Sequence, residues 1–223
     1  MKIYPPRSRH RPRPLRHQPM HLIYRLKGSV PKVAALKLLQ WKNEALDELQ
    51  AEYGLPEKMS GDRLIAYVDK QEQIQDVFEL RYEQLLGGAK QGPYWLSDER
   101  AKREVINSWL HLERMGEVQL FAISVMSNHV HMLLQHPDPD GCTHVDEILF
   151  RHKKYTGTRI NQLQEKTGRR CWARPFYDRD VRPGRFYKTL WYVINNPVAA
   201  NLTVAPLDWC GTYVTPALLQ ELR

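Results

Sequence analysis

Apolar and polar residues follow two different periods along the chain, and these periods predict its secondary structure. Strand-like runs, rich in β-branched and aromatic residues, cover residues 20–28, 117–126, 129–136 and 171–181. Apolar residues at helical spacing cover residues 32–53, 62–86, 97–115, 144–166 and 185–196. The chain is therefore predicted to form one strand, three helices, two strands, a helix, a strand and a final helix.

This order of elements predicts an α+β fold, in which helices pack against an antiparallel sheet. The first two helices form a hairpin inserted between the first strand and the rest of the fold. Repeated Arg-Pro without apolar periodicity predicts a flexible, positively charged arm over residues 1–19. We expect a single domain over residues 20–213, with the helical insertion at residues 32–92, and a tail at residues 214–223.

Polar residues and one proline predict where three of the helices begin or end. Ser97 is expected to cap the helix that follows it, with Asp98 in its acidic first turn. Thr143 and Asp146 have the spacing of a capping box for the helix over residues 144–166. Pro197 is expected to halt or kink the last helix.

The composition is that of an ordinary globular protein. The chain has 223 residues, of which 42% are hydrophobic and 26% charged, enough to build a proper core. No apolar stretch approaches the roughly 20 residues that a membrane span needs. The basic N-terminus is not followed by the apolar region of a secretory signal. Three scattered cysteines are too few for a disulfide framework or a zinc knuckle, so we expect a reducing, cytoplasmic setting.

Positive charge is in excess and is clustered, which is typical of a nucleic-acid binder. Lys and Arg number 33 against 25 Asp and Glu, giving a formal charge of +8. The excess gathers in the arm and between residues 151 and 188; a merely soluble basic surface is the alternative. The predicted DNA contacts are Lys153, Lys154, Tyr155, Arg159, Arg169, Arg170, Arg174, Arg179 and Arg182. Trp172 and Tyr177 lie among them and could either stack on unpaired bases or pack in the core.

Two histidines stand at period 2 in the strand over residues 129–136. On a strand, the side chains of His129 and His131 leave the same face, about 6–7 Å apart along the chain. Such a pair can share one divalent metal ion. The alternative is a pair of hydrogen-bonded or solvent-facing histidines on an edge strand.

The last helix offers groups that could complete such a site. Tyr192 and Asn196 are four residues apart and so lie on one helical face. A phenol hydroxyl and an amide oxygen facing the histidines would make a mixed nitrogen and oxygen site with a nucleophile beside it. Spacing alone does not choose between Tyr187 and Tyr192, and packing in an aromatic-rich helix is a further alternative.

The sequence resembles a known family in these same segments. MSNHVHMLL is similar to the HUH motif (His–hydrophobic–His) of single-tyrosine transposases, with Ser127 where that family usually has Pro. RPFYDRDVR followed by LWYVINNPVAANL resembles the C-terminal signature of the REP-associated tyrosine transposases. The resemblance runs from about residue 20 to residue 213 and includes the closing DWCGTY.

The resemblance implies a fold, a set of site residues and an activity. It implies a ferredoxin-like α+β domain, the HUH endonuclease fold, with four or five antiparallel strands. His129, His131 and Asn196 would hold Mg²⁺ or Mn²⁺, and Tyr192 would be the nucleophile. The implied reaction is cleavage and rejoining of single-stranded DNA through a 5′-phosphotyrosine, at hairpin-forming targets such as REP elements or transposon ends.

Two other functions remain open at the level of the sequence. One is a regulator that binds hairpin DNA without cleaving it. The other is a metal-dependent phosphodiester hydrolase that uses the histidines with water and forms no covalent intermediate. The partner in each case is single-stranded or hairpin DNA, the protein acts as a monomer or homodimer, and no membrane is involved.

Overall fold

The structure is a computed structural model that describes residues 12–87 and 92–221. The described chain divides into two compact units. The sheet unit is built by residues 12–29 and 92–221, and the helical unit by residues 30–87. No helix within these described ranges is both long enough and apolar enough to cross a membrane.

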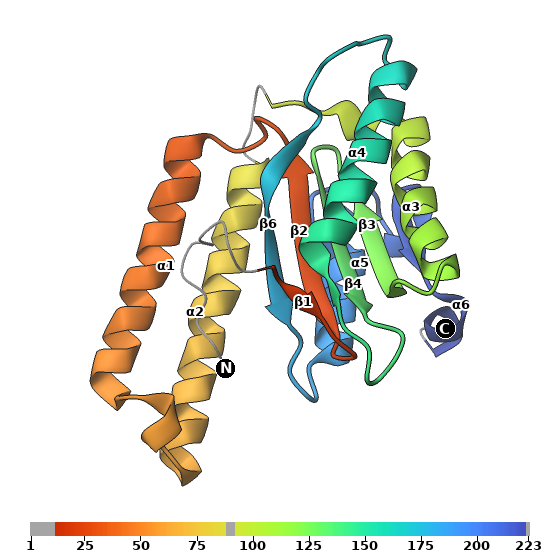
Figure 1. Ribbon diagram of the computed structural model, residues 1–223. Coiled ribbons are helices and arrows are strands. Elements are labelled where there is room, and N and C mark those ends of the chain that lie inside the picture. Colours follow the sequence, from red (N-terminus) through yellow and green to blue (C-terminus); the bar gives the residue numbers. More distant parts are fainter. Residues whose placement is uncertain (1–11, 88–91, 222–223) are drawn as a thin grey trace. The chain divides into compact units, whose positions relative to one another are not determined.

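The sheet unit is organised around five antiparallel strands in the order β6-β2-β4-β3-β7 (Figure 1). Their bounds are β2 (Met20–Leu26), β3 (Gln119–Val125), β4 (His129–Gln135), β6 (Trp172–Asp180) and β7 (Thr212–Val214). A separate two-stranded sheet pairs β1 (Pro14–Leu15) with β5 (Thr143–His144). Strand β4 is therefore an interior strand, with β2 on one side and β3 on the other.

The helices of this unit cover the sheet and connect its strands. They are α3 (Glu99–Arg114), α4 (Val145–Leu163), α5 (Phe186–Ala199), α6 (Pro216–Glu221) and the short 3₁₀ helices η2 (Trp95–Ser97) and η3 (Pro206–Asp208). The succession β2–α3–β3–β4–α4–β6, with β6, β2, β4 and β3 side by side, is the ferredoxin-like arrangement. The predicted α+β fold class is confirmed.

The strand register separates two apolar clusters on opposite faces of the sheet. On one face Tyr24 and Met132 belong to the larger cluster, which also contains Trp109 of α3. On the other face Leu133 packs with Leu190 and its buried neighbours on α5. Figure 1 shows α3 and α4 on one side of the sheet and α5 on the other. The histidines of β4 alternate with Met132 and so belong to the α5 face.

The turn between β3 and β4 is tight, as the sequence predicts. Ser127 and Asn128 form the connection, and the backbone N–H of Met126 donates to the carbonyl oxygen of His129 at 2.9 Å. Because the turn fixes the register of the hairpin, it also fixes which face His129 and His131 occupy.

Both predicted N-terminal caps are wrong. Asp98, rather than Ser97, caps α3, because its Oδ1 accepts a hydrogen bond from the backbone N–H of Arg100 at 2.9 Å. Helix α4 begins after His144 without a side-chain cap. Asp146 does not complete a capping box there, because its Oδ2 accepts from the backbone N–H of Arg13 at 2.6 Å.

Residues 12–19 are not part of a flexible arm, contrary to our expectation. The guanidinium of Arg13 forms ion pairs of 2.5 Å with both Asp178 and Asp180 of β6. Leu15 lies in the larger apolar cluster and is fully buried. The charge of Arg13 is therefore paired with carboxylates of the protein itself, and these contacts anchor residues 12–19 to the sheet unit. The remaining part of the predicted arm, residues 1–11, lies outside the described residues.

The C-terminal region also differs from the expectation. Helix α5 continues through Pro197 to Ala199, because a proline in the last turn removes only one backbone donor. The segment predicted as a tail forms α6, and Leu218 of that helix is buried against the α5 cluster. Strand β7 and helix α6 were not predicted, because both are too short to show a periodic pattern of apolar residues.

The helical unit is the predicted hairpin inserted after β2. Its helices α1 (Lys32–Tyr53) and α2 (Gly61–Gly87) are joined through η1 (Pro56–Lys58). Aromatic side chains link them: the rings of Tyr53 and Tyr67 are 5.9 Å apart, and the Arg81 guanidinium lies 4.0 Å from the ring centroid of Trp41.

Candidate functional site

The two histidines of β4 lie side by side and are buried. The ring centroids of His129 and His131 are 4.9 Å apart, with planes inclined by 78°. Their side chains share the face of the sheet that carries α5, as period 2 predicts. His129 is 4% exposed and His131 is completely buried. Because β4 is an interior strand, the alternative of an edge-strand pair does not apply.

Asn128 holds the first of these imidazoles in a defined orientation. The Nδ1 atom of His129 lies 2.6 Å from Oδ1 of Asn128. An amide oxygen only accepts, so Nδ1 of His129 is the donor and carries the hydrogen. In the neutral ring the lone pair is then on Nε2, which is the state that binds a metal ion. Asn128, the polar residue directly before His129, therefore orients the His129 ring.

His21 of β2 is a third histidine in this centre, and the sequence analysis missed it. Its Nε2 lies 3.3 Å from Nδ1 of His131, and the two rings are nearly parallel, with an interplanar angle of 13°. Only 1% of its surface is exposed. The pattern MHLIYRL could place His21 on one face of a strand, but the pairing of β2 with β4 is a long-range contact that one sequence does not reveal.

Tyr192 of α5 meets two of the histidines. Its ring centroid is 5.8 Å from that of His131 and 5.4 Å from that of His21, and both contacts are edge-on. Helix α5 is held over the sheet by an apolar row that includes Leu190 and Ile194. Tyr192 lies outside this row, on the side of the helix that faces the imidazoles.

Tyr187, the other candidate nucleophile, lies elsewhere. Its hydroxyl donates a hydrogen bond to Oε2 of Glu221 at 2.7 Å, and 54% of its surface is exposed. This contact raises the pKa of Tyr187, because the neighbouring carboxylate accepts from the neutral phenol and repels the phenolate. Tyr192 is therefore the tyrosine that lies beside the histidines, and Tyr187 is not.

Asn196 is buried one turn after Tyr192, but its side chain turns back to its own helix. Its Nδ2 donates to the backbone carbonyl oxygen of Tyr192 at 2.7 Å. In the part of the chain that the structure describes, no hydrogen bond joins Asn196 to the histidines. The amide oxygen is the atom through which this side chain could serve as the expected third ligand.

The donor set fits a divalent metal ion. His129 and His131 present two imidazoles on one face, and Asn128 fixes the ring of His129. Imidazole accepts many divalent ions, so these residues do not decide between Mg²⁺, Mn²⁺ and others. The phenol of Tyr192 lies beside this pair in a largely buried centre.

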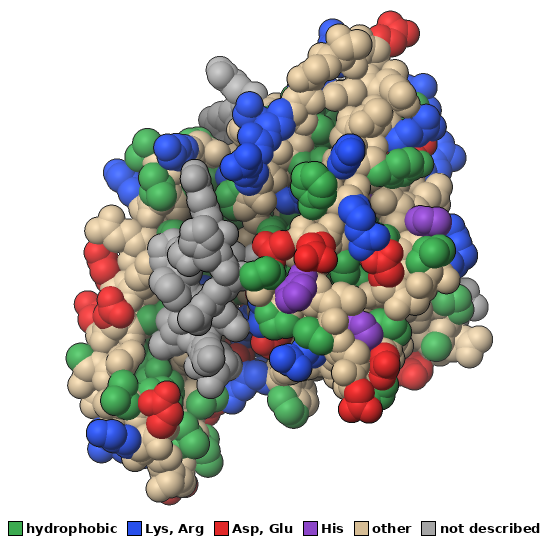
Figure 2. Space-filling view, viewed as in Figure 1, with side chains coloured by type: hydrophobic (Ala, Val, Ile, Leu, Met, Phe, Trp, Pro, Cys, Tyr) green, Lys and Arg blue, Asp and Glu red, His purple; other side chains and the backbone are tan. Residues whose placement is uncertain are grey.

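A basic groove lies on the opposite side of the sheet unit, between α4 and β6. It has a volume of about 470 Å³. Figure 2 shows Lys and Arg side chains gathered over this part of the surface. Gly157 of α4 allows the close approach of the two elements, since a Cβ there would already touch Cys171 at 3.4 Å and Trp172 at 3.5 Å. The groove brings together several of the predicted DNA contacts, namely Lys153, Lys154, Arg169, Arg170 and Arg174.

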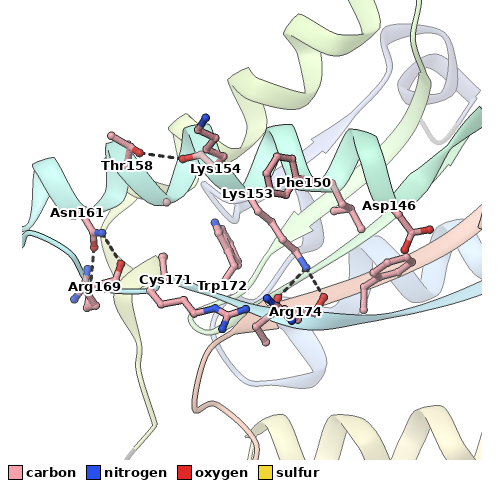
Figure 3. A pocket seen from close by; sticks show the side chains of 15 residues that line it. Asp146, Phe150, Lys153, Lys154, Thr158, Asn161, Arg169, Cys171, Trp172 and Arg174 are labelled. Carbon is pink, nitrogen blue, oxygen red and sulfur yellow. Dashed lines mark hydrogen bonds between the residues drawn. The ribbon is translucent and has the colours of Figure 1, made fainter. Parts of the chain in front are cut away.

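Lys153 occupies the middle of this groove in an unusual environment. It reaches from α4 to β6, where its Nζ donates to the carbonyl oxygens of Ala173 at 3.0 Å and Arg174 at 3.4 Å (Figure 3). These carbonyls lie where the pairing of β6 with β2 is irregular. Burial, with smaller effects of nearby arginines, lowers the pKa of Lys153 to about 7.

The other predicted DNA contacts differ in their surroundings. Lys154, Arg170 and Arg174 are exposed in or beside the groove. Two others are engaged within the protein: Arg159 pairs with Glu104 at 3.0 Å, and the Arg169 guanidinium lies 3.7 Å from the Trp95 ring centroid.

The structure does not bring the remaining predicted contacts into the groove. Arg179 pairs with His21 in the sheet and so lies on the α5 face, and Arg182 follows the end of β6. Tyr155 is about half exposed on α4. Trp172 packs in the core, where its Nε1 donates to Oγ1 of Thr156 at 3.0 Å, so the core alternative applies to it.

Comparisons with known proteins give a distant structural likeness. A scan of protein-family models and a search of curated proteins both gave no match. Among solved structures, the chain is similar to a REP-associated tyrosine transposase bound to a REP hairpin, with a TM-score of 0.49 and 11% identity. The alignment covers 97% of this chain and 88% of that one. At such a distance the chemistry of this chain has to be argued from its own residues.

Proposed function

We propose that this protein cleaves and rejoins single-stranded DNA, with Tyr192 as the nucleophile and a divalent cation held by the histidine pair. The observation that carries the proposal is the position of Tyr192, whose ring contacts His131 and His21 beside the imidazole pair. The resemblance of MSNHVHMLL and LWYVINNPVAANL to single-tyrosine transposase motifs supports the same residues.

In this proposal, His129 and His131 would hold the cation through their Nε2 atoms, and the amide oxygen of Asn196 would be the third protein ligand. A divalent ion bound there would draw negative charge from the oxygens of the scissile phosphate. Asn128 keeps the His129 ring in the binding tautomer. The centre therefore orients a phosphodiester beside a phenol.

The chemical step is a transesterification. The hydroxyl oxygen of Tyr192 forms a bond to phosphorus, and the bond from phosphorus to the 3′-oxygen of the preceding nucleotide breaks. The phenol proton passes to solvent, and the departing oxygen takes up a proton to become a 3′-hydroxyl. Because the 5′-phosphotyrosine is still a phosphodiester, a second 3′-hydroxyl can reverse the step without an external energy source.

The proposed substrate is DNA that is unpaired at the cleavage position and is flanked by a hairpin, as in REP elements or transposon ends. A buried centre favours a flexible single strand over a rigid duplex. The exposed cations Lys154, Arg170 and Arg174 would bind the phosphate backbone, since such contacts supply most of the affinity for nucleic acid. The proposed protein is a monomer or homodimer that acts in the cytoplasm at the nucleoid.

A covalent adduct tests this proposal directly. The protein is incubated with labelled single-stranded hairpin DNA and Mn²⁺, and the products are separated on a denaturing gel. We expect a protein–DNA band that is lost in Tyr192→Phe and kept in Tyr187→Phe. The second variant is a matched control, because it removes the same hydroxyl five positions away on the same helix.

The two alternative functions give different results in the same experiment. Cleavage without an adduct would support a metal-dependent hydrolase that uses water as the nucleophile. Hairpin binding with neither cleavage nor adduct, over a range of hairpins and divalent ions, would support a non-cleaving regulator.

A further inference from the structure

His131 is held by another imidazole, whereas His129 is held by an amide. Nδ1 of His131 lies 3.3 Å from Nε2 of His21 across the β2–β4 pair. An amide oxygen can only accept, so Asn128 fixes the tautomer of His129 without ambiguity. A neutral imidazole can either accept or donate through a given nitrogen. The state of His131 therefore depends on that of His21.

We propose that His21 is a positioning residue for the cation site, accepting the Nδ1 hydrogen of His131 and so keeping the lone pair of His131 on Nε2. This inference rests on the proposed function of the histidine pair. In the opposite arrangement His21 would donate to Nδ1 of His131, and the hydrogen of His131 would be on Nε2. That tautomer cannot bind a cation through Nε2. Only one of the two arrangements is therefore compatible with the cation site.

The surroundings of His21 hold its ring in place. The side chain is almost completely buried, at 1% exposure. Tyr192 contacts it edge-on at 5.4 Å, and Tyr177 of β6 does so at 6.4 Å. Because the ring is held on several sides, its Nε2 stays directed at His131. A residue that supports a metal ligand needs such a fixed orientation.

His21 also links the cation site to the nucleophile, because the same ring contacts His131 and Tyr192. These contacts differ in kind. The contact with His131 is a hydrogen bond, and the contact with Tyr192 is one of ring edge and face. Two substitutions separate them. His21→Phe keeps a ring of similar shape and removes the nitrogen, whereas His21→Gln keeps a hydrogen-bond acceptor and removes the ring.

The experiment measures Mn²⁺ binding by titration calorimetry on the full chain, with no DNA present. Loss of a partner that orients a metal ligand typically lowers affinity by about 10- to 100-fold. We expect His21→Phe to weaken Mn²⁺ binding by at least about 10-fold, and His21→Gln to bind within about threefold of the unchanged protein. His111→Gln is the control, because His111 is an exposed histidine on α3. Thermal unfolding checks that each variant is folded.

Adduct formation gives a second readout. A residue that acts through the cation site changes the Mn²⁺ concentration needed for half-maximal rate and leaves the rate at saturating Mn²⁺ nearly unchanged. We expect this pattern for His21→Phe. Unchanged Mn²⁺ affinity in folded His21→Phe would overturn the inference, as would equal losses in His21→Phe and His21→Gln.

The failure of this inference differs from the failure of the proposed function. If the unchanged protein binds Mn²⁺ and forms the adduct while His21→Phe behaves identically, only the role of His21 is overturned. If the unchanged protein binds no divalent ion at all, the cation site of the proposed function falls, and the role of His21 falls with it.

Discussion

Two buried histidine centres lie on opposite faces of the same sheet, and strand β2 contributes to both. On the α4 face, Tyr24 of β2 bonds to His152, whose ring stacks on Trp109 at 4.6 Å. On the α5 face, His21 of β2 bonds to His131. Both centres combine imidazole with a tyrosine, yet their hydrogen bonds are arranged differently.

In the His152 centre, the hydrogen bonds form a continuous series between side chains of the core. Nε1 of Trp109 donates to the hydroxyl of Tyr24 at 2.9 Å, and that hydroxyl is hydrogen-bonded to Nε2 of His152 at 2.8 Å. Nδ1 of His152 lies 2.9 Å from the hydroxyl of Ser108. Both ring nitrogens are thus used within the fold, and burial lowers the pKa of His152 well below its ordinary value. Such a network stabilises a core and leaves no nitrogen for a ligand.

In the other centre, Nδ1 of His129 lies against Asn128, and Nδ1 of His131 lies against His21. Tyr192 lies beside these imidazoles, with its ring centroid 5.8 Å from that of His131. The comparison shows that burial alone does not tell whether a histidine has a structural or a functional role. In the proposed function, the difference is that the α5-face imidazoles would bind a cation, whereas that of the His152 centre holds the core together.

The largest expected difference between the centres is in cleavage. His129→Ala or His131→Ala should reduce adduct formation by at least about 1,000-fold, since several kcal/mol of charge stabilisation would be lost. Hairpin binding should stay within a few-fold, because phosphate contacts supply most of the affinity. Gel-based adduct assays and fluorescence anisotropy measure the two effects. Full cleavage by either variant in Mg²⁺ or Mn²⁺ would remove the α5-face centre from the mechanism.

A substitution in the His152 centre should lower the stability of the protein. His152→Phe leaves the hydroxyls of Tyr24 and Ser108 buried without their imidazole partner, and each such group costs about 1–3 kcal/mol. We expect the free energy of unfolding to fall by roughly 2–4 kcal/mol, measured by urea denaturation, while the Mn²⁺ affinity is unchanged. A clear loss of Mn²⁺ binding in the folded variant would show that the two centres are coupled through β2.

The His152 centre should also give stability a pH dependence. Its pKa is lowered in the folded protein, so below the ordinary value of 6.5 the unfolded chain binds a proton that the folded chain does not. Stability is therefore complete above about pH 6.5 and falls by about 1.4 kcal/mol per pH unit as the pH drops below it. Urea denaturation at pH 7.5 and 5.5 measures this loss. His152→Phe should show a correspondingly smaller difference between the two pH values, and an equal difference would assign the effect to other groups.

The sequence predicted the fold and part of the α5-face centre, because both depend on local patterns. Period 2 placed His129 and His131 on one face, and the strong apolar runs located the five long helices and four main strands. His21 and His152 were not predicted, because their roles arise from pairing and packing between distant segments. Arg13 was assigned to a flexible arm for the same reason. Its aspartate partners on β6 are more than 160 residues away along the chain.

Lys153 shows how the α4 face could also serve DNA binding. Its pKa is lowered to about 7, so the ammonium is charged at pH 6 and largely neutral at pH 8. Hairpin binding should therefore weaken by roughly fivefold from pH 6 to pH 8. A fivefold change corresponds to about 1 kcal/mol of binding free energy, which is typical of one partly screened ionic contact. Anisotropy titrations of Tyr192→Phe in EDTA measure binding without cleavage or metal. Lys153→Met should abolish this pH dependence, whereas Lys154→Met should weaken binding at both pH values alike.

The smallest expected effect concerns Asn196, the proposed third ligand of the α5-face centre, whose side chain bonds to its own helix. Its Nδ2 donates to the carbonyl oxygen of Tyr192, so its amide oxygen is the group available to a cation. Water can replace one neutral oxygen ligand at little cost, and Asn196→Ala should therefore raise the Mn²⁺ concentration for half-maximal cleavage by only about threefold. The rate at saturating Mn²⁺ should be kept. Asn195→Ala is the matched control, because Asn195 is exposed at the preceding position of the same helix. If Asn196→Ala instead lowered the saturating rate without changing the Mn²⁺ requirement, the side chain would act by holding the turn that carries Tyr192, and the third ligand of the proposed site would have to be sought elsewhere.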